Sequence, residues 1–153
     1  MVDIKKELIE YLNSQQVMAL ATFGRHVWSC TVYFSTDKDL NLYFISHAET
    51  EHCKNIAMNP EVACSIADSR QVMSDKKIGV QIVGRAVELS NIEKIGAALA
   101  FWSKENLDID ADISLERIKK RALESRAYRI TPSEIKFFNE KLFGPEGYDI
   151  IRM

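Results

Sequence analysis

Residues 42–56 read LYFISHAETEHCKNI, and within them a strand pattern gives way to a helix pattern. Aromatic and branched side chains dominate as far as Ser46, so a strand is predicted over Leu40–Ser46. Thr50 then stands where a helix N-cap belongs. A helix is therefore predicted over Thr50–Met58, and Asn59-Pro60 ends it.

The predicted start of this helix has the features of an anion site. The first turn of a helix carries unpaired backbone N–H groups and the positive end of the helix dipole. Hydroxyl and cationic side chains beside that end would complete a phosphate site. The chain supplies such candidate groups at Ser46, His47, Thr50, His52 and Lys54. The alternative is an ordinary capped helix whose polar side chains face solvent.

The rest of the chain is organised around further strands. Hydrophobic periodicity predicts an amphipathic helix over residues 2–14 and two more over Ile92–Lys104 and Ser114–Glu124. It predicts strands over Val17–Phe23, His26–Ser35, Glu61–Ala67, Ile78–Leu89, Ala127–Ile130, Ile135–Phe138 and Tyr148–Ile151. Gly79 and Gly84 are candidate bulges in the long strand. Short connections between the strands predict a mainly β (α+β) fold, an antiparallel barrel of about six to eight strands with peripheral helices.

Composition excludes several classes of protein. The chain has 153 residues, which predicts one domain over residues 1–153. Its net charge of −2 argues against a protein that coats nucleic-acid phosphates. No apolar stretch approaches the roughly 18 residues of a membrane helix, and no secretion signal is visible. The three cysteines, Cys30, Cys53 and Cys64, lack CxxC spacing, which predicts a cytoplasmic protein with reduced thiols.

No metal-binding motif is recognisable. His47 and His52 are five residues apart, so one helix face cannot present both imidazoles. The acidic triplet within residues 108–112 resembles the start of a calcium loop. Ile113 and Lys119 stand where that loop needs Gly and Glu, so an exposed acidic loop is predicted instead.

Catalytic residues cannot be named from the sequence. It contains no GxSxG, Walker or GxGxxG motif, and nothing marks a serine or cysteine nucleophile. A short basic cluster on the last predicted helix is interpreted as a solvated helix face. It consists of Arg117, Lys119, Lys120 and Arg121.

Taken in order, these segments resemble the pyridoxamine 5′-phosphate oxidase-like, FMN-binding split β-barrel superfamily. The similarity covers roughly residues 5–90 and rests on the order of several motifs. They are VMALAT at 17–22, VYF at 32–34, LYFIS at 42–46, TEH at 50–52, NPEVA at 59–63 and GRA at 84–86. The segment from Tyr128 to Gly144 is most similar to a small, uncharacterised bacterial branch of that superfamily.

The resemblance implies a homodimer with FMN in a groove between the two chains. The phosphate ligands of the superfamily include a Ser/Thr-x-Lys element, which here is Thr50-Glu51-His52, with histidine in place of lysine. Ser46, His47, Lys54 and Asn55 are further phosphate candidates. The flavin ring would lie near Trp28, Ser29, Thr31 and Val32, and Gln81 and Val83 would reach it across the dimer.

The expected function is therefore that of a flavin-dependent oxidoreductase acting on a small molecule. A true pyridoxamine phosphate oxidase is not expected, because the Arg- and His-containing C-terminal substrate segment is not recognisable. One alternative is a haem-binding or haem-degrading split barrel with His26, His47 or His52 as axial ligand. Others are an enzyme that uses a deazaflavin and a non-catalytic dimeric binding module whose flavin site has decayed.

Overall fold

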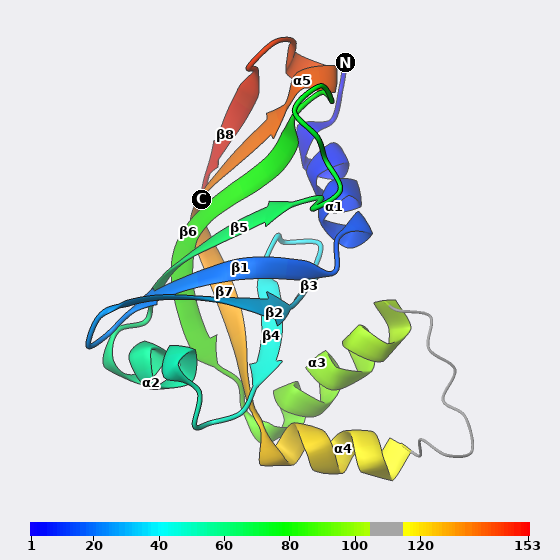
Figure 1. Ribbon diagram of the computed structural model, residues 1–153. Coiled ribbons are helices and arrows are strands. Elements are labelled where there is room, and N and C mark those ends of the chain that lie inside the picture. Colours follow the sequence, from blue (N-terminus) through cyan, green and yellow to red (C-terminus); the bar gives the residue numbers. More distant parts are fainter. Residues whose placement is uncertain (105–114) are drawn as a thin grey trace.

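The computed structural model describes residues 1–104 and 115–153, and Figure 1 shows their arrangement. Among these residues eight strands form one curled sheet with five helices around it. The strands are β1 (Val17–Phe23), β2 (Val27–Tyr33), β3 (Ser35–Thr36), β4 (Leu42–Ser46), β5 (Glu61–Ala67), β6 (Ile78–Glu88), β7 (Arg126–Asn139) and β8 (Tyr148–Arg152). The helices are α1 (Ile4–Ser14), α2 (Glu51–Met58), α3 (Asn91–Lys104), α4 (Leu115–Glu124) and α5 (Glu140–Phe143).

All strand pairs in the sheet are antiparallel, and the strand order is β2-β1-β5-β6-β7-β4-β3, with β8 paired to β7. The sheet curls so that β2 and β4 approach each other although they do not pair. This confirms the predicted antiparallel split barrel with peripheral helices. No helix in the described part of the chain is long and apolar enough to cross a membrane.

The core fills the concave side of the curled sheet. Phe34, Phe44 and Phe137 are buried there, together with Leu8 and Leu12 from one face of α1. Leu8 and Leu12 are one turn apart on that helix, so α1 closes one side of the barrel.

The second predicted strand divides into two. β2 ends at Tyr33, and β3 then pairs with β4. The third strand begins at Leu42 rather than Leu40, because Leu40 has φ of 68° in the preceding turn. The side chain of Asp37 holds this turn by accepting hydrogen bonds from the backbone N–H groups of Asp39 and Asn41.

The prediction of two short strands after residue 126 is wrong, because β7 runs continuously from Arg126 to Asn139. Pro132 lies within it, opposite Gly84 on β6, where the register of the two strands shifts. Proline lacks an N–H group for the ladder, and a bulge is where a strand tolerates that loss. A Cβ on Gly84 would lie 2.5 Å from the carbonyl oxygen of Thr131, so the close approach requires glycine.

Helices α3 and α4 form a pair between β6 and β7 in the chain and lie against the end of the sheet (Figure 1). Ala98 of α3 and Ile118 and Ala122 of α4 are buried between them. Ile45 of β4 packs against the same cluster. The acidic triplet, Ile113 and the predicted cap Ser114 lie outside the described residues.

Candidate functional site

A pocket of about 640 Å³ lies where α3 and α4 meet β2 and β4. We call it the helix-pair pocket. Aromatic side chains and arginines line it together with a smaller number of other polar groups. The lining consists of Tyr33, Ile45, His47, Ala98, Phe101, Trp102, Arg117, Ile118, Arg121, Ala122, Glu124 and Ser125. Its volume is in the usual range for small-molecule sites.

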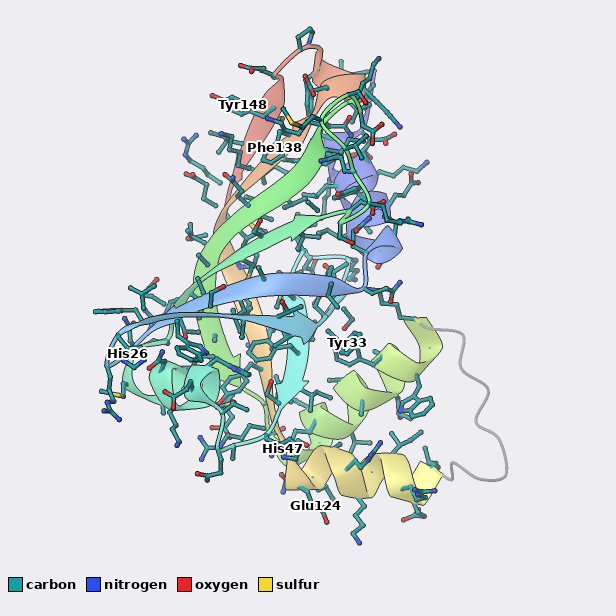
Figure 2. The ribbon with its side chains drawn as sticks, viewed as in Figure 1. His26, Tyr33, His47, Glu124, Phe138 and Tyr148 are labelled. Carbon is teal, nitrogen blue, oxygen red and sulfur yellow. The ribbon has the colours of Figure 1, made fainter. Side chains whose placement is uncertain are left out.

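Two strand ends supply the sheet side of the helix-pair pocket. Tyr33 is the last residue of β2, 65% exposed, and His47 directly follows β4. Figure 2 shows Tyr33 on the side toward α3, and His47 beside the end of α4 that carries Glu124. The pocket therefore combines Tyr33, Ile45 and His47 from the sheet side with aromatic and charged side chains from the two helices.

A second hollow, of about 420 Å³, lies on the outward face of the sheet, and we call it the sheet hollow. Ser29, Gln81 and Val83 of the same chain line it, whereas the prediction placed Ser29 beside the flavin ring and had Gln81 and Val83 reach that ring across the dimer. Small residues of β1 and β5, including Ala21 and Ala63, form its floor. Ser29 and Tyr33 are four positions apart on β2, so both point outward, and each lines one of the two hollows.

The remaining predicted residues of β2 differ in environment. Thr31 is exposed between Ser29 and Tyr33, whereas Val32 points inward and belongs to the core. Trp28 is 40% exposed and makes an edge contact with His26, with 5.8 Å between ring centroids. The outward strip of β2 is thus Ser29, Thr31 and Tyr33.

The predicted anion site forms a compact cluster at the start of α2. His52 Nε2 lies 2.7 Å from Ser46 Oγ and 3.3 Å from Thr50 Oγ1. Thr50 is the N-cap: its hydroxyl oxygen accepts from the Cys53 N–H at 3.3 Å. The backbone N–H groups of Glu51 and His52 have no acceptor within the helix, as at any helix start. The structure therefore brings Ser46, Thr50 and His52 together, as predicted.

This cluster offers neutral donors rather than a fixed cation. His52 is only 8% exposed, and burial lowers the pKa of its imidazole below the ordinary value. The ammonium group of Lys54 is exposed and lies 4.0 Å from a carboxylate oxygen of Glu49. A bound phosphate would meet hydroxyl, imidazole and backbone donors at the dipole end of α2.

Asn55 faces the interior instead. It is 1% exposed, and its amide nitrogen donates to Thr22 Oγ1 at 3.1 Å and to the carbonyl oxygen of His26 at 3.3 Å. These bonds join α2 to the β1–β2 hairpin. The geometry gives Asn55 a role in holding α2 against the sheet.

Sequence reasoning missed most of the helix-pair pocket. Arg117 and Arg121 were predicted to lie on a solvated helix face, and both are indeed exposed, yet they line the pocket. Their spacing of four residues puts them on one face of α4, next to the buried Ile118 and Ala122. The four-residue spacing of the two arginines shows in the sequence that they share a helix face. It does not show which part of the fold that face lies against.

No group of three or more His, Cys, Asp or Glu residues that could hold a metal ion is found in the described part of the chain. The described residues define an antiparallel split barrel with two hollows, both lined in part by β2. The family model of pyridoxamine 5′-phosphate oxidase matches residues 4–139, and the chain belongs to that family. A search of curated proteins gave no match.

Several solved structures share the fold at low sequence identity. The conserved hypothetical protein Rv2991 from Mycobacterium tuberculosis superposes with a TM-score of 0.80 at 15% identity, covering 96% of this chain and 91% of that one. General stress protein 26 from Bacillus anthracis has a TM-score of 0.67 at 15% identity, covering 99% and 100%. HutZ, the haem storage protein from Vibrio cholerae, has a TM-score of 0.65 at 14% identity, covering 86% and 91%.

Proposed function

We propose that this protein binds FMN and acts as a flavin-dependent oxidoreductase on a small molecule. The observation that carries the proposal is the cluster of Ser46, Thr50 and His52 at the start of α2, a helix that contacts β2. The outward strip of β2 supplies a surface for the ring, and the Ser46–Thr50–His52 cluster supplies donors for the phosphate. A bound flavin would supply the redox chemistry, and the chain would hold and orient it.

The phosphate end of the proposal rests on α2. The Thr50 and Ser46 hydroxyls each lie within hydrogen-bonding distance of the His52 imidazole, at the end of α2 where the first-turn N–H groups lack acceptors within the helix. Neutral donors at a helix N-terminus are sufficient to bind an anion. Because His52 replaces the lysine that the superfamily uses, we expect weaker phosphate binding than a lysine would give.

The ring end of the proposal requires a second copy of the chain. The sheet hollow is open to solvent on its outward side, and Ser29, Gln81 and Val83 of one copy are among its lining residues. We propose that a homodimer supplies the opposite wall. Light scattering should then report about twice the 17.5 kDa mass of the chain. A monomer at all concentrations would remove the composite site.

The cofactor proposal is tested by the visible spectrum of the purified protein before and after addition of FMN. Flavin bands that stay with the protein through gel filtration would support it. Thr50→Ala should weaken FMN binding by roughly 1–3 kcal/mol, because the Thr50 hydroxyl, which donates to the His47 carbonyl oxygen and accepts from the Cys53 N–H, holds the first turn of α2 and its backbone donors in place. Thr50→Ser keeps the hydroxyl and the helix cap and is the matched control. Equal affinity of both variants would place the phosphate elsewhere, and a protein that ignores FMN would leave the proposal without support.

Haem is a second candidate, because His47 lines the helix-pair pocket. Neither of the other two histidines lines that pocket: His26 contacts Trp28, and His52 is held by Ser46. The likeness to HutZ, whose name describes haem storage, is compatible with this candidate. A Soret band on addition of haemin, lost in His47→Ala and kept in His26→Ala, would favour haem over flavin.

A further inference from the structure

We propose that Arg126, the first residue of β7, supplies the positive charge of a phosphate site at the start of α2. The ligand would be a phosphate monoester, such as the phosphate end of FMN. Such a group carries nearly two negative charges at neutral pH, whereas Ser46, Thr50 and His52 offer neutral donors. The inference names a further ligand for the phosphate end of the proposed function and rests on that part of it.

Arg126 lies directly opposite Ser46 in the sheet. The two residues form the last pair of the antiparallel ladder between β4 and β7, two positions beyond the pair of Phe44 and Tyr128. Directly opposed residues have Cα atoms about 4.5–5.5 Å apart and side chains on the same face. Because Phe44 and Tyr128 are buried in the core, Arg126 and Ser46 share the inward face where β4 ends and β7 begins (Figure 1).

The first turn of α2 packs against Ser46. His52 Nε2 lies 2.7 Å from Ser46 Oγ. The ring centroids of His52 and Phe44 are 6.2 Å apart. The N–H groups of this turn that lack acceptors within the helix therefore lie near the inward face to which Arg126 belongs. A phosphate at the turn would be within reach of the long arginine side chain.

Arg126 also meets α2 through Tyr128. A hydrogen bond with Tyr128 raises the pKa of Arg126, so its guanidinium group lies at the phenol oxygen. Burial, together with the nearby Cys53 thiol, raises the pKa of Tyr128. Cys53 is in the first turn of α2, and its N–H group donates to the cap hydroxyl of Thr50 at 3.3 Å. Arg126 and Ser46 thus approach this turn from two neighbouring strands.

Glu88 on β6 is the ion-pair partner of Arg126. One of its carboxylate oxygens lies 3.9 Å from Arg126 Nε, and the side chains of Arg126 and Glu88 are 40% and 51% exposed. Exposed pairs of this kind interact weakly. A guanidinium group has five N–H donors, so Arg126 can keep its contacts with Glu88 and Tyr128 and still donate to a phosphate. The site does not require an unpaired arginine, and Glu88 acts as a competitor of the anion.

Lys54 is less suited to the same role. Its ammonium group lies 4.0 Å from a carboxylate oxygen of Glu49 on the surface. Residues two apart on a helix do not share a face, so Lys54 points away from the side on which His52 contacts Ser46. Arg126, by contrast, shares the inward face with Ser46.

Thermal unfolding of the flavin-free full chain with inorganic phosphate tests the site. Sodium phosphate replaces sodium chloride at constant pH and ionic strength, so that screening is unchanged. A ligand that binds the folded state raises the melting temperature. We expect phosphate to raise the melting temperature of the unmodified chain and to leave that of Arg126→Gln unchanged. Arg126→Lys keeps the charge and should keep part of the rise. Glu88→Gln removes the competing carboxylate and should enlarge it.

Comparison of FMN with riboflavin, which lacks the phosphate, tests the same residue in the cofactor site. Arg126→Gln should lower the affinity for FMN about tenfold or more, because hydrogen bonds between charged groups are lost, and should leave the affinity for riboflavin unchanged. A residue that only supports the fold would change both affinities alike. Arg129→Gln removes a charge from the same strand, where Arg129 pairs with Glu93 at 3.7 Å, and should change neither affinity.

Several results would overturn the inference. They are a lack of stabilisation by phosphate, an unchanged response of Arg126→Gln to phosphate, changes in the same direction for Arg126→Gln and Glu88→Gln, or an equal loss of FMN and riboflavin affinity in Arg126→Gln. A chain that responds to phosphate through Arg126 but does not bind FMN would support this inference and refute the flavin proposal. A chain that binds FMN equally well with and without Arg126 would do the reverse.

Discussion

Lys104 Nζ lies 2.8 Å from the carbonyl oxygen of Phe34 and 4.2 Å from the centroid of the Phe34 ring. The Lys104 ammonium group thereby makes two contacts with Phe34, a hydrogen bond to its carbonyl oxygen and a cation–π contact with its ring. Phe34 is buried in the core between β2 and β3. The contact links the end of α3, the helix that also carries Phe101 and Trp102 of the helix-pair pocket, to the centre of the fold.

Lys104→Met should lower the free energy of unfolding by about 1.5–3 kcal/mol, because hydrogen bonds from a charged donor are lost while the apolar stem is kept. Urea unfolding followed by circular dichroism measures the change. Lys119→Met is the control: its ammonium group lies 3.8 Å from Glu116 on the surface, and its loss should change stability by less than about 0.5 kcal/mol. Equal effects of the two substitutions would contradict the anchoring role of Lys104.

The sequence predicted the elements that local patterns define. Thr50 caps α2 as expected, since an N-cap depends only on its neighbours in the chain. The continuity of β7 was not predicted, because Pro132 normally marks an interruption. Only the pairing with Gly84, far away in the chain, shows that a bulge accommodates it. The place of Arg121 was missed for a related reason: periodicity assigns it to a helix face but does not show that this face lines the same pocket as Tyr33.

The stability of the protein should decrease in mildly acidic solution because of His52. Burial lowers the pKa of His52 in the folded chain, whereas in the unfolded chain the imidazole titrates near its ordinary pKa of about 6.5. Between the two values the unfolded chain binds more protons, so the free energy of unfolding falls as the pH falls. The contribution is complete above about pH 6.5 and is lost as the pH falls through the lowered pKa of the folded state.

Urea unfolding between pH 5 and pH 7.5 measures this effect. His52→Gln removes the titrating group and should flatten the pH dependence. His26→Gln, which changes an exposed histidine, should leave it steep. If the free energy of unfolding of His52→Gln depended on pH as steeply as that of the unmodified protein, folding would not change the pKa of His52, and the prediction would be wrong.

Two glycines should respond in opposite ways to alanine. At Gly84 a new Cβ would lie 2.5 Å from the backbone oxygen of Thr131, so strands β6 and β7 would have to separate. We expect Gly84→Ala to destabilise the protein by about 1–3 kcal/mol, as overpacking does. At Gly96, in the interior of α3, a Cβ meets no atom within 4 Å. Gly96→Ala should stabilise by about 0.5–1 kcal/mol, because alanine favours a helix. Thermal unfolding compares the two, and a stabilising Gly84→Ala would contradict the close approach at the bulge.

Asn55 should prove structural rather than a ligand of the cofactor. Its amide donates to Thr22 Oγ1 and to the His26 carbonyl, and it is buried. Asn55→Ala leaves both acceptors unpaired and should cost about 1–3 kcal/mol of stability. Asn13→Ala, at an exposed position of α1, is the control and should change stability by less than about 0.5 kcal/mol.

At a temperature where the Asn55→Ala variant is still folded, its affinity for FMN should match that of the unmodified protein, whereas the affinity of Thr50→Ala should be lower. A stable Asn55 variant that has lost FMN binding would instead place its amide in the cofactor site.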